Sequence, residues 1–119
     1  MDQQVEQRTQ QVCSILHDKK AQDIVCLDIA HMTVMAEAFV LCSGRSSVQV
    51  KALFDELEET LLAEQVAPVR KEGYSEGRWA VLDYGDFMVH IFQEEEREFY
   101  NLERLWVDGN NVTHFPPRV

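Results

Sequence analysis

The segment Gly44-Arg45-Ser46-Ser47 has the composition of a loop that could hold a phosphate group. Glycine lets the backbone approach a ligand closely, and a helix beginning after the loop would direct free N–H groups at the anion. Nucleotidyl transfer needs such a loop together with paired carboxylates that hold two metal ions. The next acids, Asp55 and Glu56, fall on a predicted helix, whereas Asp83 and Asp86 flank a predicted turn. A nucleotidyltransferase-like enzyme using Gly44 to Ser47 is therefore the alternative hypothesis, and a helix cap is the simpler interpretation.

Other patterns of catalytic or metal-binding residues are absent from the sequence. It contains neither the common nucleotide-binding motifs nor the zinc-protease motif, and its four histidines are isolated from one another. A catalytic triad of Ser46 or Cys42 with His90 and Asp83 is conceivable, but no spacing in the sequence supports it. We therefore expect a protein that is not an enzyme and that needs no cofactor or metal.

Aromatic and acidic residues gather between residues 73 and 86. Aromatic anchors surrounded by polar groups are typical of protein interfaces, and carboxylates there would select Arg or Lys on a partner. An alternative interpretation is that Trp79 belongs to the hydrophobic core. The segment contains Tyr74, Trp79 and Tyr84 together with Glu76, Asp83 and Asp86.

The charge of the chain is strongly acidic and unevenly distributed. The 119 residues carry a net charge of −10, with 13 acidic residues against four basic ones between residues 54 and 98. Because 45% of the residues are apolar, this charge sits on a folded protein. An acidic surface repels phosphates, so we expect little or no direct nucleic-acid recognition and no binding to anionic membranes. A basic protein is the better candidate partner.

The cellular location is predicted from the cysteines and the N-terminal segment. Cys13, Cys26 and Cys42 are odd in number and lack metal-type spacing, as expected for reduced thiols in a cytosolic protein. The N-terminal residues show neither the apolar run of a signal peptide nor the composition of a transit peptide. No stretch approaches the roughly 20 apolar residues of a membrane span. We therefore expect a cytoplasmic protein.

The elements that must position these residues are predicted from hydrophobic periodicity. They are a helix over 2–20, strands over 23–29 and 37–43, a helix capped at Ser46, an edge strand over 66–70, strands over 79–84 and 87–93, and a helix over 94–106. Gly85-Asp86 is predicted to turn a hairpin, whose second strand is apolar on both faces. The fold class is thus α/β, a single mixed β-sheet of about five strands with helices packed on it.

Two of the predicted helices have recognisable details. Ser46 and Gln49 have the spacing of a capping box, in which the serine side chain accepts from the glutamine N–H and the glutamine side chain reaches back. The helix over 94–106 begins with acids that complement its dipole. Its apolar residues are Phe99, Leu102, Leu105 and Trp106.

Four segments of the chain, 18–24, 43–50, 76–92 and 98–106, closely resemble the Iojap family of ribosomal silencing factors. The resemblance runs from about residue 5 to residue 108, in the order and spacing of the family. It implies one ribosomal silencing factor domain over residues 1–108, with a nucleotidyltransferase-like fold that lacks the catalytic carboxylates. Residues 109–119 lie beyond the family pattern and are expected to form a flexible C-terminal tail.

The resemblance also implies a function. Such a factor would bind the large ribosomal subunit through its universal protein number fourteen and sterically block association with the small subunit, which would lower translation under nutrient limitation. Homodimer formation is a further implication, although the sequence itself does not show it. Carried over to this sequence, the partner-binding residues are Trp79, Asp83, Tyr84 and Asp86, with Glu76 and Arg78 on the approach to them.

Overall fold

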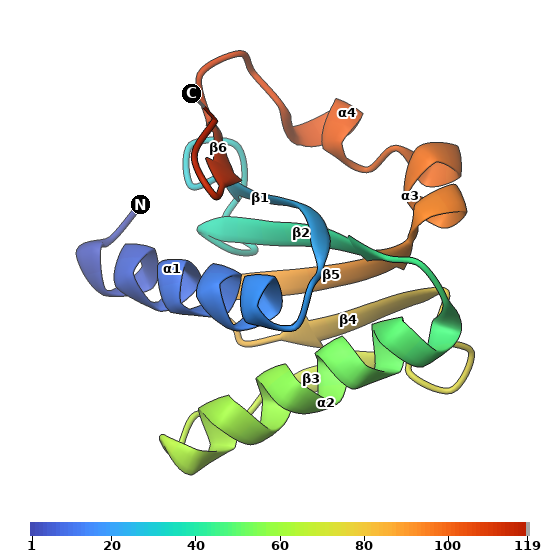
Figure 1. Ribbon diagram of the computed structural model, residues 1–119. Coiled ribbons are helices and arrows are strands. Elements are labelled where there is room, and N and C mark those ends of the chain that lie inside the picture. Colours follow the sequence, from blue (N-terminus) through green and yellow to red (C-terminus); the bar gives the residue numbers. More distant parts are fainter. Residues whose placement is uncertain (119) are drawn as a thin grey trace.

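Helices and strands follow one another along residues 1–118, which are the residues that the computed structural model describes (Figure 1). The N-terminal half contains α1 (Gln3–Asp18), β1 (Gln22–Asp28), β2 (Ala38–Gly44) and α2 (Ser47–Ala63). The C-terminal half contains β3 (Arg70–Glu72), β4 (Trp79–Asp83), β5 (Phe87–Gln93), α3 (Glu94–Tyr100), α4 (Glu103–Trp106) and β6 (Val112–Phe115).

All the strands form one mixed sheet with the order β3-β4-β5-β2-β1-β6. The pair β2 and β5 is parallel and lies at the centre, while every other neighbouring pair is antiparallel. Every residue of β2 is buried, as expected for a strand covered on both faces. The predicted α/β class with a single mixed sheet is confirmed, although the sheet has six strands where about five were expected.

The two faces of the sheet are covered by different parts of the chain. The helices α1 and α2 pack on one face and form the larger core cluster (Figure 1). On the other face, a second cluster joins strand residues to Ile29 and Ala36 of the loop after β1 and to Leu102 and Trp106 near α4. The predicted burial of both faces of β5 is confirmed, because Val89 lies in the first cluster and Phe92 in the second.

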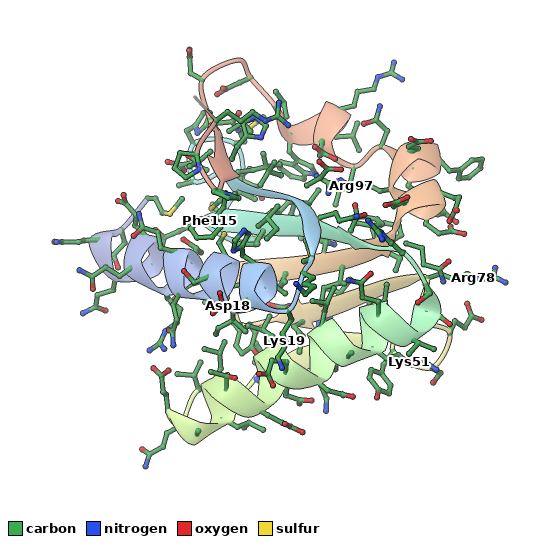
Figure 2. All side chains as sticks on the ribbon, in the orientation of Figure 1. Asp18, Lys19, Lys51, Arg78, Arg97 and Phe115 are labelled. Carbon is green, nitrogen blue, oxygen red and sulfur yellow. The ribbon has the colours of Figure 1, made fainter. Side chains whose placement is uncertain are left out.

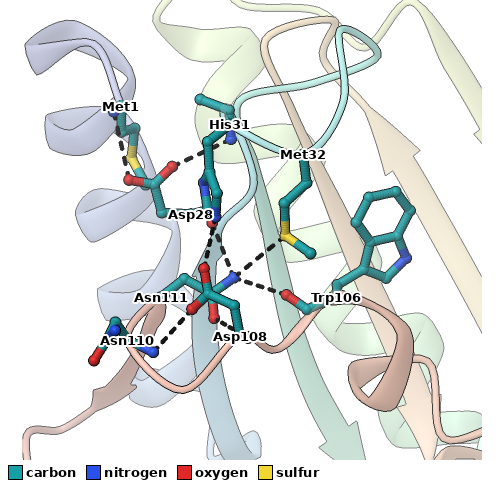
Figure 3. Close-up of polar contacts among 9 residues, drawn as sticks. Met1, Asp28, His31, Met32, Trp106, Asp108, Asn110 and Asn111 are labelled. Carbon is teal, nitrogen blue, oxygen red and sulfur yellow. Dashed lines mark hydrogen bonds and ion pairs between the residues drawn. The ribbon is translucent and has the colours of Figure 1, made fainter.

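The C-terminal segment contradicts its predicted flexibility. Val112–Phe115 form β6, which pairs antiparallel with β1 and extends the sheet at that edge. The buried Asn111 secures the entry to this strand, because its Nδ2 donates to the carbonyl oxygens of Asp28 at 3.0 Å and Trp106 at 2.7 Å (Figure 3). Nearby, His31 Nε2 lies 2.6 Å from Asp108 Oδ2 and joins the loop after β1 to the loop before β6. The prediction of a tail over 109–119 is therefore wrong for Val112–Phe115.

Two other predicted boundaries are also wrong. The edge strand expected over 66–70 lies instead at Arg70–Glu72, beyond Pro68, which has no N–H to donate to a ladder. The single helix expected over 94–106 is divided into α3 and α4, because Asn101 ends α3 in a left-handed conformation with φ of 47°. This break turns α4 away from the line of α3 and separates their apolar residues.

Candidate functional site

An aromatic cluster extends from the sheet to the surface at the start of β4. Trp79 lies opposite Phe92 in the β4–β5 ladder, and their rings stack with centroids 4.9 Å apart. The ring of Tyr100, on α3, also contacts the indole with centroids 5.0 Å apart, and the rings of Phe99 and Tyr100 have centroids 5.0 Å apart. Phe92 is fully buried, whereas Tyr100 is 51% and Phe99 79% exposed. The aromatic cluster, defined as Phe92, Trp79, Tyr100 and Phe99, is thus anchored in the core and open to solvent at its outer end.

A single arginine attaches α3 to the rest of the protein. Arg97 has a side chain only 10% exposed and lies between α3 and the sheet (Figure 2). Its guanidinium donates to Glu103 Oε1 at 2.7 Å, to Ser43 Oγ at 2.9 Å and to the carbonyl oxygen of Asp23 at 2.6 Å. Several directional bonds from one planar group fix its orientation. Arg97 therefore holds α3, and with it Tyr100 and Phe99, in a defined position against β1 and β2.

The indole of Trp79 is held by a hydrogen bond to a buried histidine. Trp79 Nε1 donates to His90 Nδ1 at 3.0 Å. Because Nδ1 accepts this bond, the neutral imidazole carries its proton on Nε2. Burial of His90 lowers the pKa of the imidazole to about 4, and Asp83 opposes this shift only in part. The histidine is therefore a neutral acceptor at physiological pH.

The helix α3, which carries Phe99 and Tyr100, also carries exposed acidic side chains. Glu95 precedes Phe99 by four residues on α3, so the two side chains share one face of this helix. Glu94, Glu95 and Glu98 are exposed. Within residues 1–118, none of these three glutamates forms an ion pair, whereas Glu56 and Glu58 of α2 pair with Lys19 and Lys71. The negative charge beside the cluster is consequently free to attract a basic partner.

The six predicted contact residues do not form one continuous surface. Glu76 and Arg78 are exposed in the loop before β4 and lie next to Trp79 in the chain. Asp83 is four residues further along β4, about 13 Å away at the usual strand rise. The structure therefore brings Glu76 and Arg78 to the aromatic cluster and places the other three residues at the far end of the hairpin.

Each of the three far residues is engaged in local structure. Asp83 accepts from the N–H of Gly85 at 2.8 Å and pairs with Arg70 at 3.5 Å. Tyr84 packs against the core cluster under α1 and α2, where burial raises the pKa of its hydroxyl to about 12. Asp86 is exposed in the turn, and its carbonyl oxygen accepts from Glu37 N at 2.7 Å. Tyr84 thus points to the opposite face of the sheet from Trp79.

The sequence did not separate the apolar residues of 94–106 into buried and exposed ones, and it did not single out Tyr100. Phe99 and Leu105 are 79% and 71% exposed. Leu102 and Trp106 pack on the second core cluster. The adjacent pair Phe99-Tyr100 carries no local signal of exposure, since the adjacent residues Leu53 and Phe54 of α2 are both buried in one core cluster.

The loop from Gly44 to Ser47 is a helix cap in which side chains of the protein accept hydrogen bonds from the backbone N–H groups of Arg45 and Gln49. Ser46 Oγ accepts from Gln49 N at 3.2 Å, which confirms the first half of the capping box. The glutamine side chain accepts from the N–H of Arg45 at 2.6 Å rather than from that of Ser46. The loop before β4 also covers this site, since a Cβ on Gly77 would lie 3.0 Å from Ser47. A phosphate would have to displace both groups.

Among residues 1–118, no three His, Cys, Asp or Glu side chains are placed to hold a metal ion. In the same part of the chain, no helix is both long enough and apolar enough to cross a bilayer. The site thus combines a mixed α/β scaffold, a capped loop and an exposed aromatic cluster.

The comparisons with known proteins give the family of this chain. Residues 2–118 match the family model described as "Ribosomal silencing factor during starvation". The ribosomal silencing factor RsfS of Halalkalibacterium halodurans is 40% identical over 95 residues, which cover 80% of this chain and 81% of that protein. The chloroplastic protein Iojap of Zea mays is 30% identical over 93 residues, covering 78% of this chain and 40% of that protein.

Two crystal structures are similar to the whole fold. A Chromobacterium violaceum protein has a TM-score of 0.83 and 31% identity, with 89% of this chain and 87% of that chain covered. A Bacillus halodurans protein has a TM-score of 0.75 and 36% identity, with coverage of 86% and 98%. The chain belongs to the ribosomal silencing factor family, and the predicted family is confirmed. Members are named as silencing factors and not as enzymes, in agreement with the predicted non-enzyme. The likeness to nucleotidyltransferases stays a prediction.

Proposed function

We propose that this protein silences translation in the bacterial cytoplasm by binding the large ribosomal subunit through its universal protein number fourteen. The bound factor would occupy the face on which the small subunit docks, so the two subunits could not join, and translation would fall when nutrients run short. Membership of the ribosomal silencing factor family supports this role. The observation that carries it is the aromatic cluster, which is rigid at its base and exposed at its tip.

The chemistry of the cluster favours a basic protein over ribosomal RNA. Tyrosine and tryptophan supply large contact areas with little rotamer entropy to lose, and they dominate binding energies at interfaces. The unpaired carboxylates of Glu95 and Glu98 would attract Arg or Lys and repel phosphates. We therefore place the centre of the contact at Trp79, Tyr100 and Phe99.

The other predicted contact residues differ in how close they lie to the centre of the proposed contact. Glu76 and Arg78 would form the rim of the contact, because they precede Trp79 in an exposed loop. Asp83 and Asp86 would contact the partner only if it reaches the far end of the hairpin. Tyr84 would support the fold from the opposite face. Homodimer formation stays a prediction, which sedimentation of the pure protein tests.

The direct test is a subunit-joining assay. Purified bacterial subunits would be mixed at moderate magnesium with increasing amounts of the protein and separated by sedimentation. We expect joined ribosomes to decrease and the protein to sediment with the large subunit only. Unchanged joining at a saturating concentration of the protein would refute the proposal.

Reversing the charge of two glutamates on α3 is expected to weaken binding to the large ribosomal subunit. The double variant Glu95→Lys with Glu98→Lys should bind large subunits about three- to tenfold more weakly, because it removes the attraction for a basic partner. The difference from wild type should shrink as salt is added. The matched control is Asp18→Lys with Glu59→Lys, which changes the net charge equally at exposed positions on α1 and α2. Equal weakening by both double variants would show that net charge, and not this surface, is responsible.

A further inference from the structure

His90 lies at the centre of an aromatic network that joins α3 to α4 through the sheet. It is 5% exposed in the middle of β5, between Val81 of β4 and Leu41 of β2. The imidazole packs edge-on with Phe39 at 4.9 Å, and Phe39 packs in the same manner with Trp106 at 5.2 Å. On its other side the imidazole bonds Trp79.

Only one of the two imidazole nitrogens has a partner. Nδ1 accepts from the indole of Trp79 at 3.0 Å, whereas Nε2 is buried and makes no hydrogen bond to any residue between 1 and 118. A buried donor without an acceptor lowers the stability of a protein, and an apolar side chain of similar size would avoid this penalty. Packing alone therefore does not account for a histidine at this position, but the bond to Trp79 does.

We propose that His90 is a positioning residue, whose Nδ1 holds the indole of Trp79 in the orientation that presents the aromatic cluster to a protein partner. This inference rests on the proposed function, since it assigns a role within the same contact. The indole contacts both the buried Phe92, with centroids 4.9 Å apart, and the exposed Tyr100, with centroids 5.0 Å apart, so a rotation of the ring would disturb the contacts that connect the core to Tyr100. A side chain that is ordered before binding loses less entropy in the complex.

Two substitutions separate the hydrogen bond from the packing. His90→Asn keeps an acceptor, because Oδ1 of asparagine is as many bonds from the backbone as Nδ1 of histidine. His90→Leu keeps an apolar volume and removes the acceptor. We expect His90→Leu to bind large ribosomal subunits about fivefold more weakly than wild type, and His90→Asn to stay within about twofold. The affinities of the two variants should not follow their free energies of unfolding. His90→Leu loses the bond to Trp79, but it also loses the unpaired Nε2 donor, whose burial lowers stability.

Whether His90 acts on binding through Trp79 is tested by introducing His90→Leu into the variant Trp79→Phe. In Trp79→Phe, which has no indole N–H, His90→Leu is expected to cause no further loss of affinity. An equal loss in both backgrounds would overturn the inference, as would wild-type affinity of His90→Leu. A loss of affinity that parallels a loss of folded protein would also overturn it.

A second readout does not depend on the ribosome. The chain has two tryptophans, and Trp79→Phe identifies the indole N–H resonance of Trp79 by its disappearance. Hydrogen exchange of this N–H should be at least about tenfold faster in His90→Leu than in wild type or His90→Asn. Equal exchange in all three proteins would overturn the inference. If wild type fails to bind large subunits, the proposed function fails, and the exchange rates still decide whether His90 holds the indole.

Discussion

Trp79→Ala is expected to weaken binding to the large ribosomal subunit about 30-fold or more, the equivalent of ~2 kcal/mol lost at a central interface residue. The indole is the middle of the aromatic cluster and contacts both the buried Phe92 and the exposed Tyr100. Its removal would leave Tyr100 without support and create a gap at the centre of the contact. Affinity would be measured by co-sedimentation of the protein with purified large subunits.

The matched control for this prediction is an exposed apolar residue at the C-terminal end of α2, which lies away from α3 (Figure 1). Leu62 is 47% exposed there, so Leu62→Ala should bind within about twofold of wild type. Because Trp79 is partly buried, its variant could also lose stability. Tyr100→Ala avoids this difficulty, since Tyr100 is 51% exposed, and it should still weaken binding about tenfold. Wild-type affinity in both Trp79→Ala and Tyr100→Ala would place the binding surface elsewhere.

Acidification is expected to destabilise the folded protein through His90. Burial lowers the pKa of this imidazole from 6.5 to about 4, so the unfolded chain binds a proton more readily than the folded one. The stability contributed by the neutral histidine is fully present above pH 6.5 and is lost as the pH falls from 6.5 through about 4. The whole shift corresponds to about 3 kcal/mol in the free energy of unfolding.

Urea unfolding at several pH values between 7 and 4 measures this effect, with His90→Leu as the control. The wild type should lose stability steadily over this range, while His90→Leu should lose much less. Hydrogen bonds also lower the carboxyl pKa values of Glu64 and Asp108, whose contribution is lost only as the pH falls toward and below 4. Both groups are exposed and screened by solvent. Parallel stability curves for wild type and His90→Leu would show that His90 does not titrate in this way.

Much of the scaffold could be predicted from local patterns in the sequence. The apolar runs of β4 and β5 on either side of Gly85-Asp86 predict a hairpin, and the capping serine at Ser46 predicts the start of α2. These features depend on residues close together in the chain, which is why periodicity and turn chemistry reveal them. The family resemblance likewise rests on such segments, and the comparisons confirm it.

The binding surface could be predicted only in part. Trp79 was identified from its aromatic and acidic neighbours in the sequence, but so were Tyr84 and Asp83, which lie elsewhere in the structure. Alternation along β4 sends Trp79 and Tyr84 to opposite faces of the sheet. The residues that complete the cluster, Tyr100 and Phe99, are distant in sequence from the hairpin and join it through α3.

The family, the acidic character and the principal helices and strands follow from the sequence, because each of these is encoded in composition or short-range pattern. Which apolar residues remain exposed depends on the tertiary structure. Arg97 docks α3 against β1 and β2 through bonds to Asp23 and Ser43, and this contact leaves Phe99 in solvent. The pairing of β6 with β1 was likewise decided by contacts across the fold. Exposure depends on which distant segment covers a side chain, and no local pattern contains that information.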